Sequence, residues 1–414
     1  MQVNFNYQNK QATFNSRNSL RVAFNEKIKR YPNDLRYLKS LAKNVGLAET
    51  ELYKLNPIIG AKQLEEILKS VPSRFFDITG DFRINLHMHT IHSDGQMSVN
   101  SLLYQSAEYA NKIKSNGIIP NFTIAITDHD NFDGAKEAVE KILAEPEKYQ
   151  KLGIVLGSEL SCEHKNLEQL THPIPYELIA YSINPYDEKM GNFLKSIREE
   201  RINLSKQIIE SAKELYPQYN FSYEDVCEFT PNTKKGINGF LYAIANYFKD
   251  RTNFNEDGEK LKDFSLKFLP KNEDKSSKIA HSIEEIFAHM KDQFGFLGIA
   301  HPAKIFLGDG ALRNDFIEKC QWEGKNTGKV VIDNFIESLV KLGGDKFKAI
   351  ETNYQSYRGD LAEAADIIEG NKPYNEEFLD CIKWLLNFKY NARKHKLLDA
   401  GGLDTHGETP FIKH

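Results

Sequence analysis

Short apolar, β-prone runs recur along the chain from residue 83 onward, and helix-like stretches separate several of them. This alternation is typical of an α/β protein with a parallel sheet or barrel. Seven runs are present, which suits a seven-stranded β/α barrel. They are Arg83–Leu86, Phe122–Ile126, Gly153–Leu156, Leu178–Tyr181, Phe296–Ile299, Lys348–Ile350 and Lys396–Ala400. Helices are expected between them, for example at Ser101–Lys114 and Gly134–Leu143.

The region before the barrel is predicted to be helical. Residues 1–18 are rich in Asn and Gln and read as a loose tail. Apolar residues at helical spacing then predict three helices, of which the first ends at Gly46 and the others cover about Glu49–Leu55 and Ala61–Leu68. We therefore expect a helical N-terminal extension at residues 1–80, with a packing or docking role, and a barrel at residues 81–414.

Two stretches between the runs are too long for simple connections. One covers about residues 187–290, with a strongly helical part at Phe193–Leu215 and a polar, charged part at Asp250–Lys278. The other covers about residues 305–345. Insertions after barrel strands commonly build substrate lids, so the first stretch is predicted to be an inserted cap or lid region.

Composition limits the class of protein and its surroundings. The net charge of −4 argues against a basic surface that coats long nucleic acids. The N-terminus lacks the apolar segment of a secretory signal, and no apolar run is long enough to span a membrane. The four cysteines are scattered without C-x-x-C pairs, which suits a reducing compartment: Cys162, Cys227, Cys320 and Cys381. We expect a soluble, cytoplasmic protein.

Metal-binding residue types follow the apolar runs. Six runs are followed within a few residues by His, Asp or Glu, and a Glu lies beside the remaining one. After the first run, His87 and His89 alternate, so both imidazoles can point to one ion. Asp94 follows in a Ser-Asp-Gly turn. An H-x-H pair alone is weak evidence, because it arises often by chance.

The other runs add motifs of the same kind. They are Thr127-Asp128-His129-Asp130, Gly157-Ser158-Glu159, Ala300-His301-Pro302 and Gly402-Leu403-Asp404-Thr405-His406-Gly407. Taken singly, such residues are more often helix caps, solvated strand ends or buried core histidines. Strand ends on one face of a barrel converge on one pocket, however, so their joint placement predicts a multinuclear metal site.

These motifs, in this order, resemble those of the PHP family (polymerase and histidinol phosphatase), over roughly residues 83 to 410. The resemblance implies a distorted seven-stranded β/α barrel with two or three metal ions at its C-terminal face. The Ser-Asp-Gly and Thr-Asp-His-Asp forms resemble the branch that acts on nucleotides and short oligonucleotides more than the histidinol-phosphate branch.

The resemblance also implies a set of ligands. A first ion would be held by His87, His89, Glu159 and Asp404. Glu159 would bridge to a second ion shared with His301, and a third ion would be held by Asp94, His129 and His406. Nitrogen and oxygen donors without thiolate fit Mn, Fe or Zn better than Mg.

The sequence departs from the family pattern at the fourth run. The family places a His at the start of that strand, where this chain has Glu177, and the nearest histidine is His172. Either Glu177 binds as a carboxylate, or His172 reaches in from a loop, or the second ion is weakly held. We favour Glu177. A second departure, Leu403 in place of the usual Ser, should affect packing more than ligation.

Two or three ions at such a site would lower the pKa of a bridging water, and the resulting hydroxide would attack phosphorus in line. His92 is a candidate general acid, or simply a loop residue. Asp128 and Asp130 flank His129 and are candidates to orient it. Candidates to bind the phosphoryl oxygens are Arg198, Arg201 and Lys304, although basic residues on helices are usually only solvated.

The predicted function is metal-dependent hydrolysis of a small phosphate ester, with a nucleotide as the favoured substrate. One alternative is an exonuclease or phosphodiesterase on short oligonucleotides, which would need a basic groove. Another is a histidinol-phosphate phosphatase, which the motif forms disfavour. A non-catalytic PHP scaffold acting as a binding module is the alternative from another class, and the retention of liganding residue types at all but one expected position argues against it.

Overall fold

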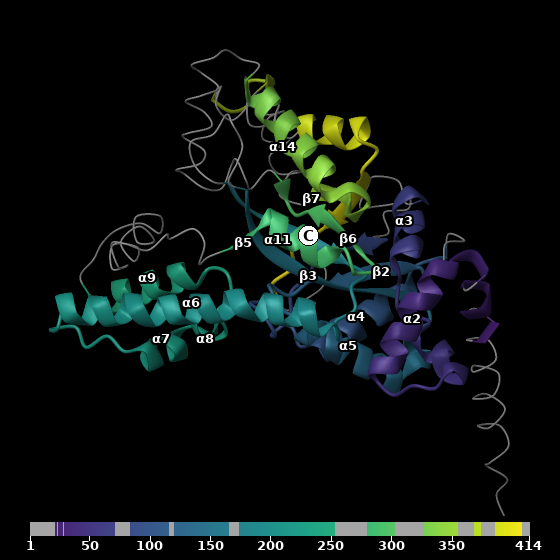
Figure 1. The fold of residues 1–414 in the computed structure, drawn as a ribbon, viewed down its shortest axis with the longest axis horizontal. Helices are drawn as coiled ribbons and strands as arrows, with labels where there is room; N and C mark the ends of the chain where they lie inside the picture. Colours follow the sequence, from purple (N-terminus) through teal and green to yellow (C-terminus); the bar gives the residue numbers. More distant parts are fainter. Residues whose placement is uncertain are drawn as a thin grey trace, which may run out of the picture.

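The computed structural model describes residues 21–22, 24–27, 29–70, 83–115, 120–164, 174–252, 280–302, 327–354, 368–373 and 386–407. A single mixed sheet lies at its centre (Figure 1). Seven of its strands follow one path, in the order β1 (Ile84–Asn85), β2 (Phe122–Ile126), β3 (Leu152–His164), β4 (Ile174–Tyr181), β6 (Phe296–Ile299), β7 (Phe347–Tyr354) and β8 (Leu398–Gly402). The short β5 (His281–Ser282) pairs with β3 off this path. The predicted α/β fold with seven barrel strands is confirmed, and β5 is an additional strand.

One strand runs against the expected parallel direction. β1, β2 and β3 are mutually parallel, as are β6, β7 and β8, but β4 is antiparallel to both β3 and β6. Only residues 165–173 separate β3 from β4, and a parallel return needs a crossover of about a dozen residues or more. The chain therefore turns back beside β3, and the barrel is distorted at this point.

The two ends of the strand path meet and nearly close the sheet. The Leu86 amide donates to the Gly401 carbonyl at 3.0 Å, and the His89 amide donates to the Thr405 carbonyl at 3.0 Å. The Leu403 amide donates to the Asn85 side chain at 3.0 Å. These bonds form a seam between the segments that contain β1 and β8, so the motifs following the first and last strands lie side by side.

Helices cover the outside of the sheet. They include α4 (Val99–Lys112), α5 (Asp133–Ala144), α11 (Ile283–Met290) and α14 (Thr327–Gly343), with the 3-10 turns η2 (Pro146–Tyr149) and η3 (Gly344–Lys346). Ser98 caps α4 by accepting from the Ser101 amide, and Ser282 and Glu285 form a capping box on α11. The apolar faces of α11 and α14 pack on β3, β4, β6 and β7 in one buried cluster.

The N-terminal extension packs against the barrel along its length. It contains α2 (Pro32–Asn44), the 3-10 helix η1 (Glu49–Leu55) and α3 (Ala61–Ser70), close to the predicted helices. Leu64, Ile67 and Leu68 of α3 share a buried cluster with residues of seven strands and their ends, from Ile84 to Ala400. Ile58 also forms a parallel bridge with Ile154. The extension therefore supplies part of the apolar filling of the barrel.

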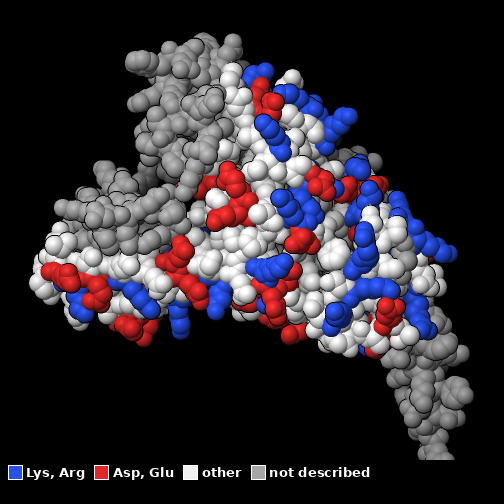
Figure 2. Space-filling model, viewed as in Figure 1, with Lys and Arg blue, Asp and Glu red and all other residues white. Residues whose placement is uncertain are grey.

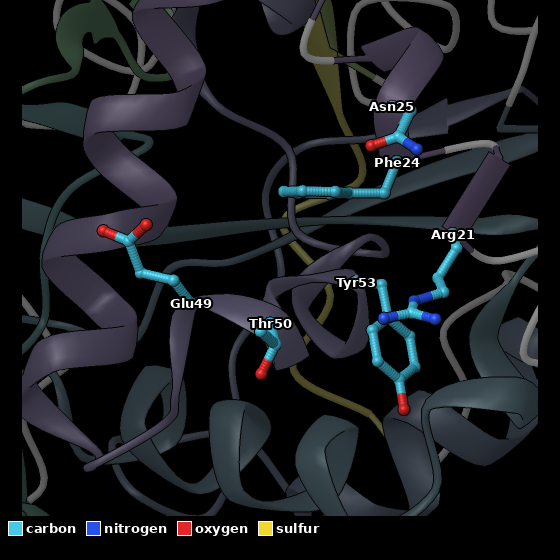
Figure 3. A pocket seen from close by; sticks show the side chains of 6 residues that line it. All are labelled: Arg21, Phe24, Asn25, Glu49, Thr50 and Tyr53. Atoms are coloured by element: carbon cyan, nitrogen blue, oxygen red, sulfur yellow. The ribbon is translucent and has the colours of Figure 1, made fainter.

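A cavity of about 370 Å³ lies within this extension, away from the strand ends (Figure 3). Arg21 lies 5.9 Å from the ring centre of Tyr53 on its wall, a cation–π arrangement. The rest of its lining comes from Phe24, Asn25, Glu49 and Thr50. Glu49 is held by an ion pair with Lys39 at 2.9 Å, which satisfies the acidic group of the lining.

The inserted region between β4 and β5 is helical where the structure describes it. It contains α6 (Glu188–Leu215), α7 (Tyr223–Phe229), α8 (Pro231–Lys235) and α9 (Phe240–Arg251), which extend to one side of the barrel (Figure 1). The second half of α6 packs on α7 and α9 around a separate apolar core that includes Ile208, Phe221 and Phe248. The first half packs on the barrel through Met190 and Leu194. The charged segment expected at Asp250–Lys278 lies almost entirely outside the described residues.

Charge is mixed on the face shown in Figure 2, where Lys and Arg are interspersed with Asp and Glu. Within the described ranges, no helix combines the length and the apolar character needed to cross a bilayer.

Candidate metal centre

The predicted ligands lie together at one end of the sheet. His87 and His89 follow β1, His129 follows β2 and His301 follows β6, while Asp404 and His406 follow β8. Glu159 lies within β3, just beyond the part that pairs with β2. Glu177 lies in the first half of β4. Because β4 is antiparallel, its beginning faces the end of the sheet that the other strands reach with their carboxyl ends.

Four of these residues form an inner set. His87 Nε2 lies 3.0 Å from Glu159 Oε2 and 3.4 Å from Asp404 Oδ1. His89 Nε2 lies 3.2 Å from Glu159 Oε2 and 3.3 Å from Asp404 Oδ1, and the two Nε2 atoms are 3.1 Å apart. A tetrahedral site with ion–ligand distances of about 2.0–2.1 Å has edges of about 3.3 Å. These four donors are therefore spaced to hold one ion, the set predicted for the first metal.

A second set lies between Glu159 and Glu177. His301 Nε2 is 3.1 Å from Glu159 Oε1 and 3.2 Å from Glu177 Oε2. His129 Nδ1 approaches the same two carboxylates, at 3.2 Å from Glu159 Oε2 and 3.6 Å from Glu177 Oε1. The carboxylate of Glu177 thus occupies the position left open by the sequence. His172 lies outside the described residues.

The third set surrounds Asp94. Asp94 Oδ2 lies 3.3 Å from His406 Nε2 and 3.5 Å from His129 Nε2. His89 Nδ1 lies 3.6 Å from Asp94 Oδ1, so the far side of the His89 ring also faces this set. His89, Asp94, His129 and His406 offer donor atoms within 4.8 Å of one another. His129 stands between the second and third sets and presents one ring nitrogen to each.

The backbone around the centre is held in unusual conformations. His301 has a φ of +23°, Asp130 of +47° and Asp404 of +51°, in the left-handed region that residues other than glycine rarely adopt. Such residues cost about 1–3 kcal/mol each and cluster at functional sites. At Gly402 a Cβ would lie 2.2 Å from the His87 Cβ and 2.3 Å from Glu351 Oε1. Only glycine lets β8 pass this close to the inner set.

Electrostatics couples these groups strongly. Burial alone would lower the pKa of His87 and His89, but the carboxylates around them prevail, raising the pKa of His87 well above its usual value and that of His89 to about 10. Burial would likewise raise the pKa of Glu159 and Asp404, but the surrounding imidazoles hold both well below the usual range. Without ions, protonated imidazoles neutralise the buried carboxylates, so the cluster itself requires positive charge.

The donor chemistry fits divalent transition metals. The centre offers imidazole nitrogens and carboxylate oxygens with no thiolate, the pattern that suits Mn, Fe or Zn. Among the described residues, Asp94 Oδ1 and His129 Nδ1 are buried without a hydrogen-bond partner. Buried polar atoms are normally satisfied, so ligation would supply what these two atoms lack.

Glu351 was not among the predicted site residues. Its Oε2 lies 3.3 Å from His87 Nδ1 and accepts the His301 amide at 2.7 Å, and its side chain is fully buried. It therefore fixes the ring of an inner ligand and the backbone of an outer one. Its position directly after the Lys348–Ile350 run was the available signal, since the other site residues follow their runs in the same way.

Asp128 lies at a different place from the one expected. Its carboxylate accepts from the Thr90 amide at 2.7 Å, from the Thr90 hydroxyl and from the Ser93 hydroxyl at 2.7 Å. Ser93 Oγ in turn lies 3.4 Å from His89 Nδ1. Asp128 thus organises the loop after β1 and acts towards His89, whereas the sequence predicted an effect on its neighbour His129.

The predicted phosphate-binding residues have separate positions. Arg201 is fully buried and its guanidinium pairs with Asp130 at 2.7 Å, which corrects its expected role, because a cation neutralised inside the protein does not face a substrate. Asp130 also accepts hydrogen bonds from the Ser161 amide and hydroxyl, so it holds β3 in place and does not orient His129. Arg198 is half-buried on α6, and its Nε has no hydrogen-bond partner among the described residues. Lys304 lies outside the described residues.

His92 lies on the loop between β1 and α4, outside the three sets. Its Nε2 is 2.7 Å from Glu137 Oε2 on α5, and both side chains are 29% exposed. A carboxylate that orients an imidazole is the arrangement expected for a proton-transfer residue. The same contact also fastens the loop to α5, so geometry allows either of the two roles weighed from the sequence.

No family model matches the chain, and no curated protein matches it either. Among solved structures, it is similar to a protein named as a metal-dependent phosphoesterase from Bifidobacterium adolescentis, with 20% identity, a TM-score of 0.46 and coverage of 78% of this chain and 88% of that chain. It is also similar to an amidohydrolase from Chromobacterium violaceum with bound sulfate and no metal, at 18% identity, a TM-score of 0.48 and coverage of 80% and 91%. The chemistry of this centre rests on its own geometry.

Proposed function

We propose that the chain is a PHP-type, metal-dependent phosphoesterase that hydrolyses a small phosphate ester, with a nucleotide as the favoured substrate. One observation carries the proposal: donors from six strands or strand ends converge on three overlapping sets that share Glu159, His89 and His129. Adjacent divalent sites of this kind are typical of phosphoester hydrolysis, because two ions can hold the attacking and the leaving oxygens.

Divalent ions bound in the three sets would activate water and neutralise charge on the phosphoryl oxygens. The chain's own residues set where that happens. The inner set, fully buried around His87 and His89, has no room for a large group and serves to anchor an ion. Asp94, Glu177 and His406 are partly exposed, with side chains 20%, 18% and 37% accessible, so a substrate would approach from their side.

Two further residues are assigned roles towards the ester. His92, oriented by Glu137, would donate a proton to the leaving oxygen. Arg198, whose Nε has no hydrogen-bond partner among the described residues, would hold a non-bridging oxygen. The nucleotide preference comes from the forms of the Ser93-Asp94-Gly95 and Thr127–Asp130 motifs. The net charge of −4 agrees with it, because a single base and sugar need no extended basic groove.

The test measures metal first and turnover second. Protein purified without chelator is analysed for bound Mn, Fe and Zn, and then assayed for phosphate release with added Mn²⁺ on nucleoside monophosphates, short oligonucleotides, sugar phosphates and histidinol phosphate. We expect at least two equivalents of metal and the highest rate on a nucleotide. His92→Asn and Arg198→Met should lower turnover while leaving metal content unchanged.

Less than one equivalent of metal would contradict the metal centre. A metal-loaded protein that releases no phosphate from any of these esters would contradict the phosphoesterase assignment. Release of mononucleotides from oligonucleotides faster than phosphate from any monoester would replace it with the exonuclease alternative.

A further inference from the structure

The turn between α8 and α9 joins the inserted helices to the metal centre. It comprises Gly236, Ile237, Asn238 and Gly239 together with Lys235, the last residue of α8, and is here called the insert turn. Gly236 has a φ of +63°, and a Cβ there would lie 2.2 Å from the Arg198 carbonyl oxygen of α6. Ile237 is fully buried beside it. The turn is therefore pressed against α6 and held in one shape.

Two contacts anchor the insert turn to the barrel. Lys235 Nζ donates to the carbonyl oxygens of Ile91 at 2.5 Å and Ser93 at 2.8 Å, in the loop that carries Asp94. The Gly236 carbonyl accepts from Arg201 at 3.2 Å, and the same guanidinium nitrogen binds Asp130, the residue after His129. These contacts fix the position of the insert turn relative to Asp94 and His129, which belong to the second and third donor sets.

Asn238 is the residue of the turn that reaches a predicted ligand. Its Nδ2 donates to Glu177 Oε1 at 2.8 Å, while its own Oδ1 accepts the Gly239 amide at 3.0 Å. The amide is thereby fixed with its NH2 group towards Glu177. Glu177 Oε2 is left facing His301 at 3.2 Å, on the side of the second donor set.

The partner matters because Glu177 is the least enclosed carboxylate of its set. Its side chain is 18% exposed, against 1% for Glu159, and its carboxylate is charged, because despite burial and the neighbouring Glu159 its pKa is lowered by His301 and His129. His301 faces one oxygen of this carboxylate, and Asn238 supplies the shortest contact to the other, so loss of Asn238 would free Glu177 Oε1 to turn towards water. Hydrogen bonds that orient a ligand from behind typically change metal affinity by about 10–100-fold when removed.

We propose that Asn238 is a positioning residue of the second metal site, so that the inserted helices are a structural part of the metal centre. This inference rests on the proposed function in so far as it assumes that the second donor set holds an ion. It assigns to the insert a role in metal binding that is separate from any contact with substrate.

The test compares Mn²⁺ binding by metal-free wild type, Asn238→Ala and Asn238→Asp, using calorimetric titration and elemental analysis after dialysis at limiting metal. Asn238→Asp keeps the acceptor for the Gly239 amide but cannot donate to Glu177, so it preserves the turn while removing the contact. Both variants should lose affinity for one ion by about 10–100-fold and keep the others. Lys234→Ala, an exposed neighbour on α8, is the matched control and should bind as wild type does.

A double-mutant cycle assigns the effect to the contact. In a Glu177→Ala background, Asn238→Asp should cause no further loss, because its target is gone. Thermal unfolding of the metal-free variants checks that each is folded. Binding curves of Asn238→Asp that overlay wild type, or an equal loss at every site, would overturn the inference. If wild type binds its ions but hydrolyses no ester, the proposed function fails while this result still stands.

Discussion

The inner and outer parts of the metal centre are held by different means. His87, His89 and Glu159 belong to β1, its extension and β3, and their side chains are at most 1% exposed. Glu177 and His406 are 18% and 37% exposed, and depend on loops and on the inserted helices. Strand register places the backbone of the inner donors, with Glu351 orienting the ring of His87, whereas the outer donor Glu177 is held by Asn238 of the inserted helices.

This difference separates donors whose positions are fixed by the fold from donors whose side chains can change orientation. Inner donors cannot move without disturbing β1, β3 and β8 together. The outer side chains are partly exposed, so their orientation depends on side-chain contacts even where, as for Glu177 in β4, strand pairing fixes the backbone. Substitutions in the two parts should therefore differ in kind.

The largest effect is expected at the inner set. His87→Ala or Asp404→Ala should abolish turnover and remove the first ion, with the fold largely retained, because each side chain supplies one corner of the inner tetrahedron. Phosphate release and metal content measure this. Residual activity above about a tenth of wild type, some 1.4 kcal/mol in barrier, would count against both as ligands.

The next largest effect is on the free energy of unfolding, at the buried Arg201–Asp130 pair beside the outer donor His129. Arg201→Met should destabilise the protein by about 3–5 kcal/mol, because it leaves Asp130 charged and unpaired in the interior. Urea unfolding of the metal-free protein measures the loss. Lys195→Met, which breaks the exposed Lys195–Glu199 pair on the same helix, should cost far less. Equal losses in the two variants would show that the buried pair is unimportant.

A smaller effect is expected at Glu351. Glu351→Gln keeps the shape of the side chain but removes the negative charge that faces His87 Nδ1, so affinity for the inner ion should fall by about tenfold. Titration of the metal-free variant with Mn²⁺ measures the change. The exposed Glu284→Gln on α11 serves as control. Unchanged affinity in Glu351→Gln would mean that register alone orients the ring.

The smallest effect is a proton count. Nearby carboxylates overcome the burial of both rings and raise the pKa of His89 to about 10 and of His301 to about 9. Both therefore carry protons at pH 7 in the metal-free protein, as does His87, whose pKa is raised well above its usual value, so ion binding should release about three. Calorimetry in buffers of different ionisation enthalpy counts them, and a count near zero would contradict these pKa values.

The same shifts set the sign of the pH dependence. The folded-state pKa values lie above the ordinary 6.5, so these His–carboxylate pairs stabilise the metal-free protein fully below about pH 6.5. That contribution is lost as the pH rises through about 9 and then 10. Thermal melts of metal-free protein between pH 6 and 10 should show the decline, and a flat profile would contradict it.

Much of the fold could be predicted because local patterns were strong. β2 and β6 coincide with their apolar runs, and α2, η1 and α3 fall where spacing placed them. The direction of β4 was missed, because apolar content does not encode direction and only the short connection at residues 165–173 hinted at it. The small β5 has two residues, too few to form a pattern.

The donor positions followed from strand ends, but the contacts around them did not. Asn238, Lys235 and Glu137 come from segments without any motif, and their partners are set by packing of helices far along the chain. Arg201 was expected in the site and lies behind it, because position on a helix does not show which charge is neutralised inside. Arg201 is buried because it pairs with Asp130, and that pairing forms only when α6 packs on the barrel in the folded protein.

The inner ion would hold together the two segments that meet at the seam between β1 and β8. His87 and Asp404 stand on opposite sides of it, and the flanking Asn85 and Leu403 are 318 residues apart in sequence. An ion bound by residues on both sides would cross-link segments that are far apart in the sequence. Closing so long a loop costs conformational entropy, and binding of the ion would offset part of that cost. Parting these strands would then require release of the ion, so amide hydrogen exchange along the seam should slow in step with inner-site occupancy.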